Sequence, residues 1–313
     1  MGRRNGQLWP GNDVWGQRKE KIMNNSTGNM SGMVQIDRPG VLARWLRSQT
    51  RSIFLLTLML PSSLFIACNP ISESMSISAE TLESPVVLEL FTSQGCSSCP
   101  PADRLLSRLQ SEGHVHGREV IVLSHHVDYW NRLGWKDPYS SAQASERQEY
   151  YAKNLNSRRL YTPQMVIDGR YETVGHNEPG IRDLIHTSGA DSRGSAISPE
   201  IQIQWLESSR VKVSVYLDRS LNQESLLVFL VQDGVQNSVP SGENANRTLA
   251  HDGVVRLMLH PSRGEINQEK DKPVFTDTIT LPEPAPGYRL VALVQSHKGS
   301  IPGADQLELQ KPN

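Results

Sequence analysis

The fold is decided by residues 88–103, which read LELFTSQGCSSCPPAD. The apolar run 86–91 predicts a buried β-strand, because it is continuous and is bounded by proline and glycine. Leucines then repeat at helical spacing up to Gln110, so a helix is expected to follow directly. Cys96 and Cys99 therefore stand between a buried strand and the start of a helix.

Two cysteines separated by two residues at this place are typical of a redox-active disulfide. One helical turn brings the two Cα atoms within the range of about 4.4 to 6.8 Å that a disulfide needs. Helix-start N–H groups favour a thiolate on the first cysteine. We therefore predict thiol-disulfide exchange, with Cys96 as nucleophile and Cys99 as resolving cysteine. Pro100 indicates that the regular helix begins only there, which would weaken this effect at Cys96.

Two other interpretations of the same cysteines stay open at this point. A structural disulfide uses the same spacing, and so does half of a metal site. His125 and His126 end the next predicted strand, 119–127, and one of them could complete a copper or zinc site with the cysteines. Neighbouring strand residues point to opposite faces, so at most one histidine should face the pair. Exchange chemistry itself needs no cofactor.

A second motif, YTPQMVIDG, covers residues 161–169. Proline cannot donate a hydrogen bond within a sheet, so Pro163 belongs at the first residue of a strand or at an edge. The strand 165–167 then runs into Asp168-Gly169, a dipeptide that favours a hairpin with a partner strand near 170–174.

These stretches, with DYWNRLGWKDP, SERQEYYA and the later VALVQ and IPGA segments, resemble a secreted thioredoxin-like family known only as domain of unknown function number twelve twenty-three. The resemblance covers about residues 86–310. It implies a thioredoxin-like fold with a C-terminal β extension, in which a cis-proline packs beside the redox pair. Thr162 and Pro163 would then bind an extended substrate through neighbouring backbone. Trp130, in the aromatic segment after the second predicted strand, is expected either to line the substrate groove or to pack in the core.

Glu89 departs from the thioredoxin pattern. The buried acid of thioredoxins lies six residues before the first cysteine, whereas Glu89 lies seven before it, and one residue along a strand reverses the face. A buried unpaired carboxylate is costly. Glu89 is therefore expected either to act as a proton relay or to be held in a structural pair.

The pattern of apolar and polar residues along the rest of the sequence predicts two domains. Residues 84–188 alternate strands and helices and predict the thioredoxin-like α/β domain. The small, polar stretch 187–198 marks a boundary. Residues 197–313 then alternate apolar and polar side chains in about six runs, which predicts an antiparallel β-sandwich-like domain.

The N-terminal part has the layout of an export signal. A polar stretch, 1–32, precedes a predicted signal peptide, 33–68, and Met33 is an alternative start. The uncharged run 53–67 follows four arginines and is shorter than the roughly 20 residues that span a bilayer. Its end resembles a lipobox, which would make Cys68 a lipidated residue before a spacer, 69–83; plain cleavage near residue 79 is the alternative.

Composition narrows the function further. The chain has 313 residues, 37% hydrophobic and 21% charged, with net charge −1. Residues 69–313 carry 23 basic and 30 acidic side chains, which argues against nucleic-acid binding. We expect a protein of the bacterial periplasm or cell envelope that acts on protein or small-molecule thiols and disulfides, with membrane attachment through a lipidated Cys68. The alternatives are a copper or zinc metallochaperone and a non-catalytic binding module.

Overall fold

The computed structural model describes residues 84–157, 159–191, 196–269, 271–282 and 287–310. The predicted leader with Cys68, the stretch before it and the whole predicted spacer lie outside these residues. Thr81–Asn313 form one compact unit. Among the described residues, no helix is both long and apolar enough to cross a membrane.

The first half of this unit alternates strands and helices, as the sequence predicts. Its elements are β1 (Val86–Thr92), α2 (Pro100–Glu112), β2 (His114–Val115), β3 (Arg118–His126), the short helix η1 (Asn131–Leu133), α3 (Ala142–Asn154), β4 (Gln164–Ile167), β5 (Tyr171–Val174) and α4 (Glu178–Asp191). β1 lies between β3, to which it is parallel, and β4, to which it is antiparallel. The loop 93–99, which carries both cysteines and is called the redox loop below, therefore follows the central strand of this group.

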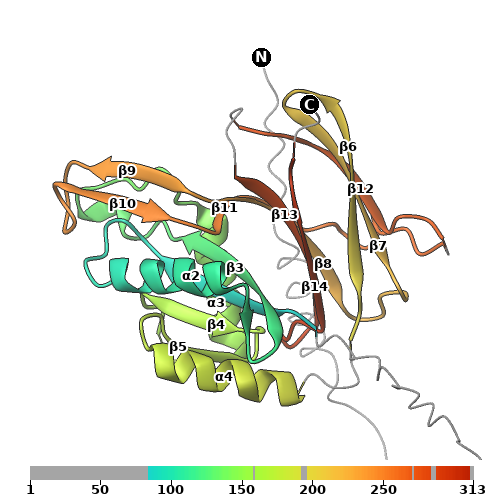
Figure 1. Cartoon of the computed structure of the whole chain (residues 1–313), viewed down its shortest axis with the longest axis horizontal. Coiled ribbons are helices and arrows are strands. Elements are labelled where there is room, and N and C mark those ends of the chain that lie inside the picture. Colours follow the sequence, from blue (N-terminus) through green and yellow to red (C-terminus); the bar gives the residue numbers. More distant parts are fainter. Residues whose placement is uncertain (1–83, 158, 192–195, 270, 283–286, 311–313) are drawn as a thin grey trace, which may run out of the picture. The chain divides into compact units, whose positions relative to one another are not determined.

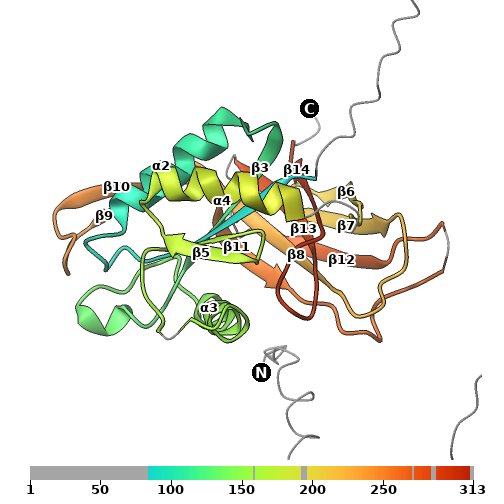
Figure 2. The same cartoon turned by 90° about the horizontal axis from the view of Figure 1, so that it is seen from below.

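Helices cover both faces of these strands. α2 and α4 lie on one face and α3 lies on the other (Figure 2). Leu88 and Leu90 of β1 pack with leucines of α2 and with Ile181 of α4. Phe91, which points to the opposite face, packs with Tyr151 of α3. Each fully buried side chain of this kind stabilises the fold by about 1.5 to 3 kcal/mol.

In the part that the structure describes, the second half contains strands and no helix. They are β6 (Pro199–Glu207), β7 (Arg210–Leu217), β8 (Ser225–Gln232), β9 (Val235–Val239), β10 (Arg247–His251), β11 (Val254–Leu259), β12 (Phe275–Thr280), β13 (Tyr288–Gln295) and β14 (Gly303–Glu308). The sequence predicts about six of these runs and misses the β9–β10 hairpin and β14. In these three unpredicted strands the alternation of apolar and polar side chains is short or interrupted, so the period of two is not visible in the sequence.

The two halves share one sheet, in the order β14-β13-β8-β11-β3-β1-β4-β5 (Figure 1). The junction is a parallel contact between β11 and β3, where the Ser124 N–H donates to the Gly253 carbonyl over 2.6 Å. The stretch 187–198 therefore marks a change in the sequence pattern, from alternating strands and helices to strands. The segments before and after it nevertheless contribute strands to the same sheet. A second, antiparallel sheet, β12-β7-β6, packs against β8 and β13 across an apolar core. The architecture is mixed α/β and dominated by sheet.

The hairpin predicted at Asp168-Gly169 is present between β4 and β5. Gly169 has φ +62°, and a Cβ there would lie 2.0 Å from the Gly299 carbonyl oxygen. Only glycine fits this approach between the hairpin and the loop after β13.

Candidate functional site

Cys96 and Cys99 form a disulfide at the junction of β1 and α2, with their Cα atoms 5.5 Å apart. Both cysteines are fully buried, whereas Ser97 and Ser98 between them are exposed. The helix begins at Pro100 with Cys99 as its N-cap residue. Cys96 therefore stands one turn before the helix, as the prolines indicate.

The β9–β10 hairpin covers the redox loop. The Asn244 side-chain amide donates to the carbonyls of Gln94 (2.9 Å) and Cys96 (2.8 Å). The Glu243 carboxylate accepts a hydrogen bond from the Ser97 N–H over 3.0 Å. Both residues lie in the turn of the hairpin, which approaches from about 150 residues further along the chain. We call these three hydrogen bonds the hairpin clasp.

The Gln94 side chain links the redox loop to the same hairpin. Its Nε2 donates to Asn237 Oδ1 and to His251 Nε2, the latter over 3.1 Å. Its Oε1 accepts from the Trp135 indole N–H over 3.1 Å. The same Oε1 also accepts from Asn237 Nδ2 over 3.1 Å, so all four hydrogen bonds of this amide are made inside the protein. The redox loop is held in one place by residues of both halves.

The Thr162-Pro163 peptide bond is cis, as the resemblance implies. Gln164, which follows the proline, pairs with Phe91 near the carboxyl end of β1. The redox loop leaves β1 at that same end. The Cys-x-x-Cys motif and the Thr162-Pro163 motif therefore both lie at the carboxyl end of β1.

The contacts of Gly175 locate Pro163 in the structure. Its N–H donates to the Pro163 carbonyl over 2.9 Å, and a Cβ on it would lie 2.9 Å from Pro163 Cβ and 3.1 Å from Ala102 Cβ. Pro163 thus lies beside the first turn of α2. Among the described residues, no hydrogen bond engages the backbone N–H or carbonyl of Thr162.

Trp130 lies against the redox loop, since a Cβ on Gly95 would be 3.4 Å from Trp130 Cβ. The side chain is half-buried, and its indole N–H has no hydrogen-bond partner in the described part of the chain. A buried donor without a partner within the protein is rare.

The first of two buried polar clusters surrounds Glu89 on the α3 face. This Glu89 cluster consists of Glu89, His125, Arg147 and Tyr151. His125 Nε2 donates to Glu89 Oε2 over 2.8 Å, Arg147 Nη2 donates to Oε1 over 2.7 Å, and Arg147 Nε and the Tyr151 hydroxyl also donate to the carboxylate. Burial alone would raise the pKa of Glu89, but these partners lower it to about 2. The carboxylate stays charged, which fits the structural pair rather than a proton relay.

The second cluster lies on the opposite face, next to the redox loop. This Asp103 cluster consists of Thr92, Asp103, His126, Asp137 and His251. Thr92 Oγ1 donates to Asp103 Oδ1 over 2.8 Å, and His126 Nδ1 lies 2.7 Å from Asp137 Oδ2. The rings of His126 and His251 meet edge to face with their centroids 4.8 Å apart. Asp137 Oδ2 also accepts from the N–H of Gln94, so the cluster reaches the redox loop directly.

Burial and neighbouring charges shift the pKa values of the Asp103 cluster in opposite directions. Burial raises the pKa of Asp103 to about 6, although the positive charge of His126 opposes this shift. Burial also acts against charge on Asp137, but His126 and its hydrogen bond lower the pKa of Asp137 to about 2. Burial and the nearby His126 lower the pKa of His251 to about 3. Asp103, Asp137 and His251 are not among the site residues predicted from the sequence.

No metal site is assembled from the predicted ligands. Cys96 and Cys99 bond to each other, while His125 is held by Glu89 and His126 by Asp137. Across the described residues, no three His, Cys, Asp or Glu side chains are grouped as they would be around a metal ion. These residues do not fit a copper or zinc ion in this disulfide form.

The fold and site define a mixed α/β protein with a buried Cys-x-x-Cys disulfide at a strand-helix junction. Residues 87–295 match the family described as "Protein of unknown function (DUF1223)", and the chain belongs to this family. No curated protein matches it.

Two solved structures share this fold. Protein AGR_C_4864 from Agrobacterium tumefaciens is 25% identical, with a TM-score of 0.53, and the alignment covers 74% of this chain and 97% of that one. HBP35 of Porphyromonas gingivalis is 15% identical, with a TM-score of 0.54, over 73% and 76% of the two chains. A domain of the outer membrane lipoprotein Omp28 from Porphyromonas gingivalis is 13% identical over 36% and 87%, and its TM-score of 0.22 is too low to support an argument.

Proposed function

We propose that this protein is a thiol-disulfide exchange protein of the bacterial cell envelope, with a thioredoxin-like first half. The observation that carries the proposal is the Cys96–Cys99 disulfide at the start of α2, with the cis Thr162-Pro163 bond at the same end of β1. The order β3-β1-β4-β5, with helices on both faces, supports the thioredoxin-like assignment. Export is supported by the arginine-flanked apolar run 53–67.

The reaction is an exchange of disulfides through a mixed intermediate. In the reduced protein, the Cys96 thiolate attacks one sulfur of a substrate disulfide, forms a mixed disulfide and releases the other substrate sulfur as a thiolate. Cys99 then attacks Cys96, closes the Cys96–Cys99 disulfide and releases the second substrate thiolate. Two electrons pass to the substrate, and the reverse steps oxidise a substrate dithiol.

The substrate would be held beside the cysteines by groups that have no partner within the protein. An extended chain can pair with the unengaged N–H and carbonyl of Thr162, as an added strand pairs with a sheet edge. The indole N–H of Trp130 can donate to the same substrate. These proposed roles, for the backbone of Thr162 beside Pro163 and for the indole of Trp130, are the ones that the sequence predicts.

Exchange requires the hairpin clasp to open. Both sulfur-bearing residues are fully buried under the β9–β10 hairpin, and a thiolate must approach along the disulfide axis to react. The clasp consists of three hydrogen bonds, two of them from the single side chain of Asn244. Opening this turn leaves the strands of both sheets in place.

Trapping variants test the exchange chemistry. Cys99→Ser should retain partners as mixed disulfides on Cys96, because the sulfur that normally releases them is gone. Cys96→Ser is the matched control and should trap few partners. Each variant is recovered from its native compartment, and reducible adducts are identified after non-reducing electrophoresis. Equal trapping by both variants, or trapping by neither, would contradict the proposal.

A further inference from the structure

The sulfur of Cys96 accepts a hydrogen bond from Ser98. The Ser98 hydroxyl oxygen lies 3.4 Å from Cys96 Sγ. Cys96 has no S–H group in the disulfide, so the hydroxyl donates and the sulfur accepts. Within the described residues, no other hydrogen bond reaches this sulfur, and the Ser98 hydroxyl makes no other bond. The hydroxyl therefore contacts the atom that reacts in disulfide exchange.

The start of α2 offers no free backbone donor to this sulfur. Backbone N–H groups at a helix start usually favour a negative charge. Here the first two positions are Pro100 and Pro101, which have no N–H. The next two N–H groups, those of Ala102 and Asp103, both donate to the Cys99 carbonyl, over 2.8 and 3.1 Å. A thiolate on the first cysteine is therefore not stabilised in the usual way, by N–H groups of the helix.

N–H groups of the redox loop are engaged as well. The Cys99 N–H donates to the Cys96 carbonyl over 3.2 Å, and the Ser97 N–H donates to the Glu243 carboxylate. Of the donors that remain in the loop, the Ser98 hydroxyl is the one that reaches the sulfur.

Acidic side chains near the redox loop oppose a negative charge on Cys96. Glu243 is exposed and accepts from the loop at Ser97. Asp137 accepts from the Gln94 N–H over 2.8 Å, and its lowered pKa keeps it charged. Burial raises the pKa of Asp103 to about 6, so this carboxyl is largely charged at pH 7. Like charges raise the cost of ionising a thiol, which makes a donor at the sulfur more important.

The arginines on the hairpin and on α2 interact elsewhere. Arg247 is exposed and donates to Asn244 Oδ1 over 3.1 Å. Arg104 is exposed on α2. Charges at exposed positions are screened by salt and contribute little to a neighbouring group.

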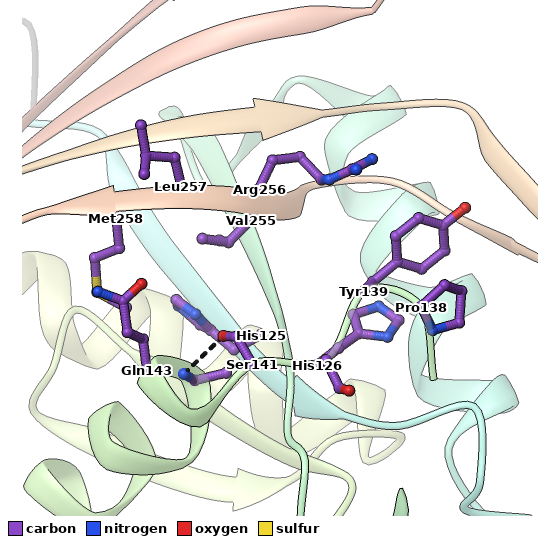
Figure 3. A pocket seen from close by; sticks show the side chains of 12 residues that line it. His125, His126, Pro138, Tyr139, Ser141, Gln143, Val255, Arg256, Leu257 and Met258 are labelled. Carbon is purple, nitrogen blue, oxygen red and sulfur yellow. Dashed lines mark hydrogen bonds between the residues drawn. The ribbon is translucent and has the colours of Figure 1, made fainter. Parts of the chain in front are cut away.

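The cationic and titratable groups of β3, β10 and β11 are engaged too. His126 is held by Asp137 over 2.7 Å, and His251 stays neutral because its pKa is lowered to about 3. Arg256 lies over the Tyr139 ring, which stands between it and His126 (Figure 3). The hydroxyl of the redox loop, rather than a cation, is therefore the group placed to stabilise charge on the sulfur.

We propose that Ser98 is a catalytic residue of disulfide exchange, whose hydroxyl donates a hydrogen bond to the Cys96 thiolate. This inference rests on the exchange function proposed above. In the disulfide the sulfur is neutral, whereas a hydrogen bond to a charged acceptor is roughly twice as strong. The bond thus becomes stronger when negative charge appears on Cys96, and such a differential interaction is what accelerates a reaction.

The bond acts most on the step that releases Cys96. When the oxidised protein acts on a substrate dithiol, one substrate thiolate attacks Cys96, and Cys99 leaves as a thiolate. The second substrate thiolate then attacks the substrate sulfur of the mixed disulfide, the bond to Cys96 breaks, and Cys96 leaves as a thiolate. Two electrons pass from the substrate to the two cysteines. Because a more stable thiolate leaves faster, Ser98 favours this direction, the oxidation of substrate dithiols.

The pH profile of Cys96 tests this role in the purified, reduced protein. The protein is alkylated at a series of pH values, and mass spectrometry of its peptides gives the rate at Cys96 separately from the other two cysteines. In Ser98→Ala, the pH at which half of Cys96 is a thiolate should rise by about one unit, because the charged form loses its donor. Ser98 is exposed, so a merely structural role would leave this midpoint in place.

Two further variants serve as controls. Ser98→Thr keeps the hydroxyl and should keep the midpoint of the unaltered protein. Ser97→Ala removes the neighbouring exposed hydroxyl, which interacts with Glu243 and not with the sulfur, and should also keep it. An unchanged midpoint in Ser98→Ala, or the same rise in either control, would overturn the assignment.

The titration needs no substrate, so its result is separate from the trapping experiment. If Cys99→Ser traps partners but Ser98→Ala leaves the midpoint unchanged, the exchange function stands and the role of Ser98 is rejected. If the midpoint rises but Cys99→Ser traps no partner, the exchange function is rejected, and the catalytic role of Ser98 with it.

Discussion

The Glu89 cluster and the Asp103 cluster stand on opposite faces of the same two strands, β1 and β3. In the first, an arginine and two further donors hold one carboxylate in its charged form. In the second, two carboxylates and two histidines share a buried space, and no arginine or lysine pairs with them within the described residues. Titratable groups whose pKa values are pushed apart are typical of functional sites. The difference indicates a structural role for Glu89 and a functional role for the cluster beside the redox loop.

The largest effect is expected from Arg147→Met. This change leaves the Glu89 carboxylate buried without its cationic partner, which should lower the free energy of unfolding by about 3 to 5 kcal/mol. Urea unfolding at pH 7 measures it. Arg108→Met, which removes an exposed ion pair with Glu178, is the control and should change little. A similar, small loss for both variants would show that the Glu89 cluster is not a structural pair.

The next effect is the pH dependence caused by Asp103. Its folded pKa of about 6 exceeds the ordinary aspartate value of 3.8, so the folded state keeps a proton that the unfolded chain releases. The stability that this proton provides is present below about pH 4 and is lost as the pH rises through 6. Asp103→Asn should not show this loss. Relative to the unaltered protein, the free energy of unfolding of the variant should therefore be about 3 kcal/mol more favourable at pH 7.5 than at pH 4.

Urea unfolding of both proteins at the two pH values checks this sign. The pH dependence of stability caused by Glu89 has the opposite sign. Its pKa is lowered to about 2, so the stabilisation that it provides is lost only as the pH falls below 4.5. A difference between Asp103→Asn and the unaltered protein that is the same at pH 4 and pH 7.5 would contradict a titrating Asp103.

A smaller effect is expected when the hairpin clasp is weakened. Asn244→Ala removes two hydrogen bonds to the redox loop, which together contribute about 1 to 2 kcal/mol. Reduction of the disulfide by dithiothreitol should become about tenfold faster. Ser238→Ala, an exposed change on β9, is the control. If both variants are reduced at the rate of the unaltered protein, the hairpin does not limit access to the cysteines.

The smallest effect is expected from Glu243→Gln. Glu243 is exposed and interacts only with Ser97, through its backbone N–H and its side chain, so loss of the Glu243 charge should accelerate reduction only about twofold. The difference should disappear in 1 M salt, where exposed charges are screened. An effect larger than that of Asn244→Ala would assign control of the clasp to Glu243 instead.

The sequence predicted the elements whose signals are local. The apolar run of β1, the prolines at the start of α2 and the Asp168-Gly169 dipeptide each specify their own backbone, so these elements are where they were expected. The cis Thr162-Pro163 bond followed from the family resemblance.

The missing features depend on contacts between distant segments. The β9–β10 hairpin has mostly polar side chains, and the role of Asn244 arises only because two loops about 150 residues apart meet. Asp103 did leave a signal, since it lies three residues before Leu106 on the buried face of α2, but only the fold shows which groups surround it. The continuous sheet arises from one contact between β3 and β11 that no local pattern encodes.

The central claim is that Cys96–Cys99 is a redox site and not a staple, and the reduction potential of this disulfide tests it most directly. Equilibrium titration in defined ratios of oxidised and reduced dithiothreitol, with the free thiols counted by mass spectrometry after alkylation, gives the value. A disulfide that takes part in exchange should have a potential between about −120 and −270 mV, the range of proteins that exchange disulfides. A potential below about −300 mV, typical of structural disulfides, would contradict it.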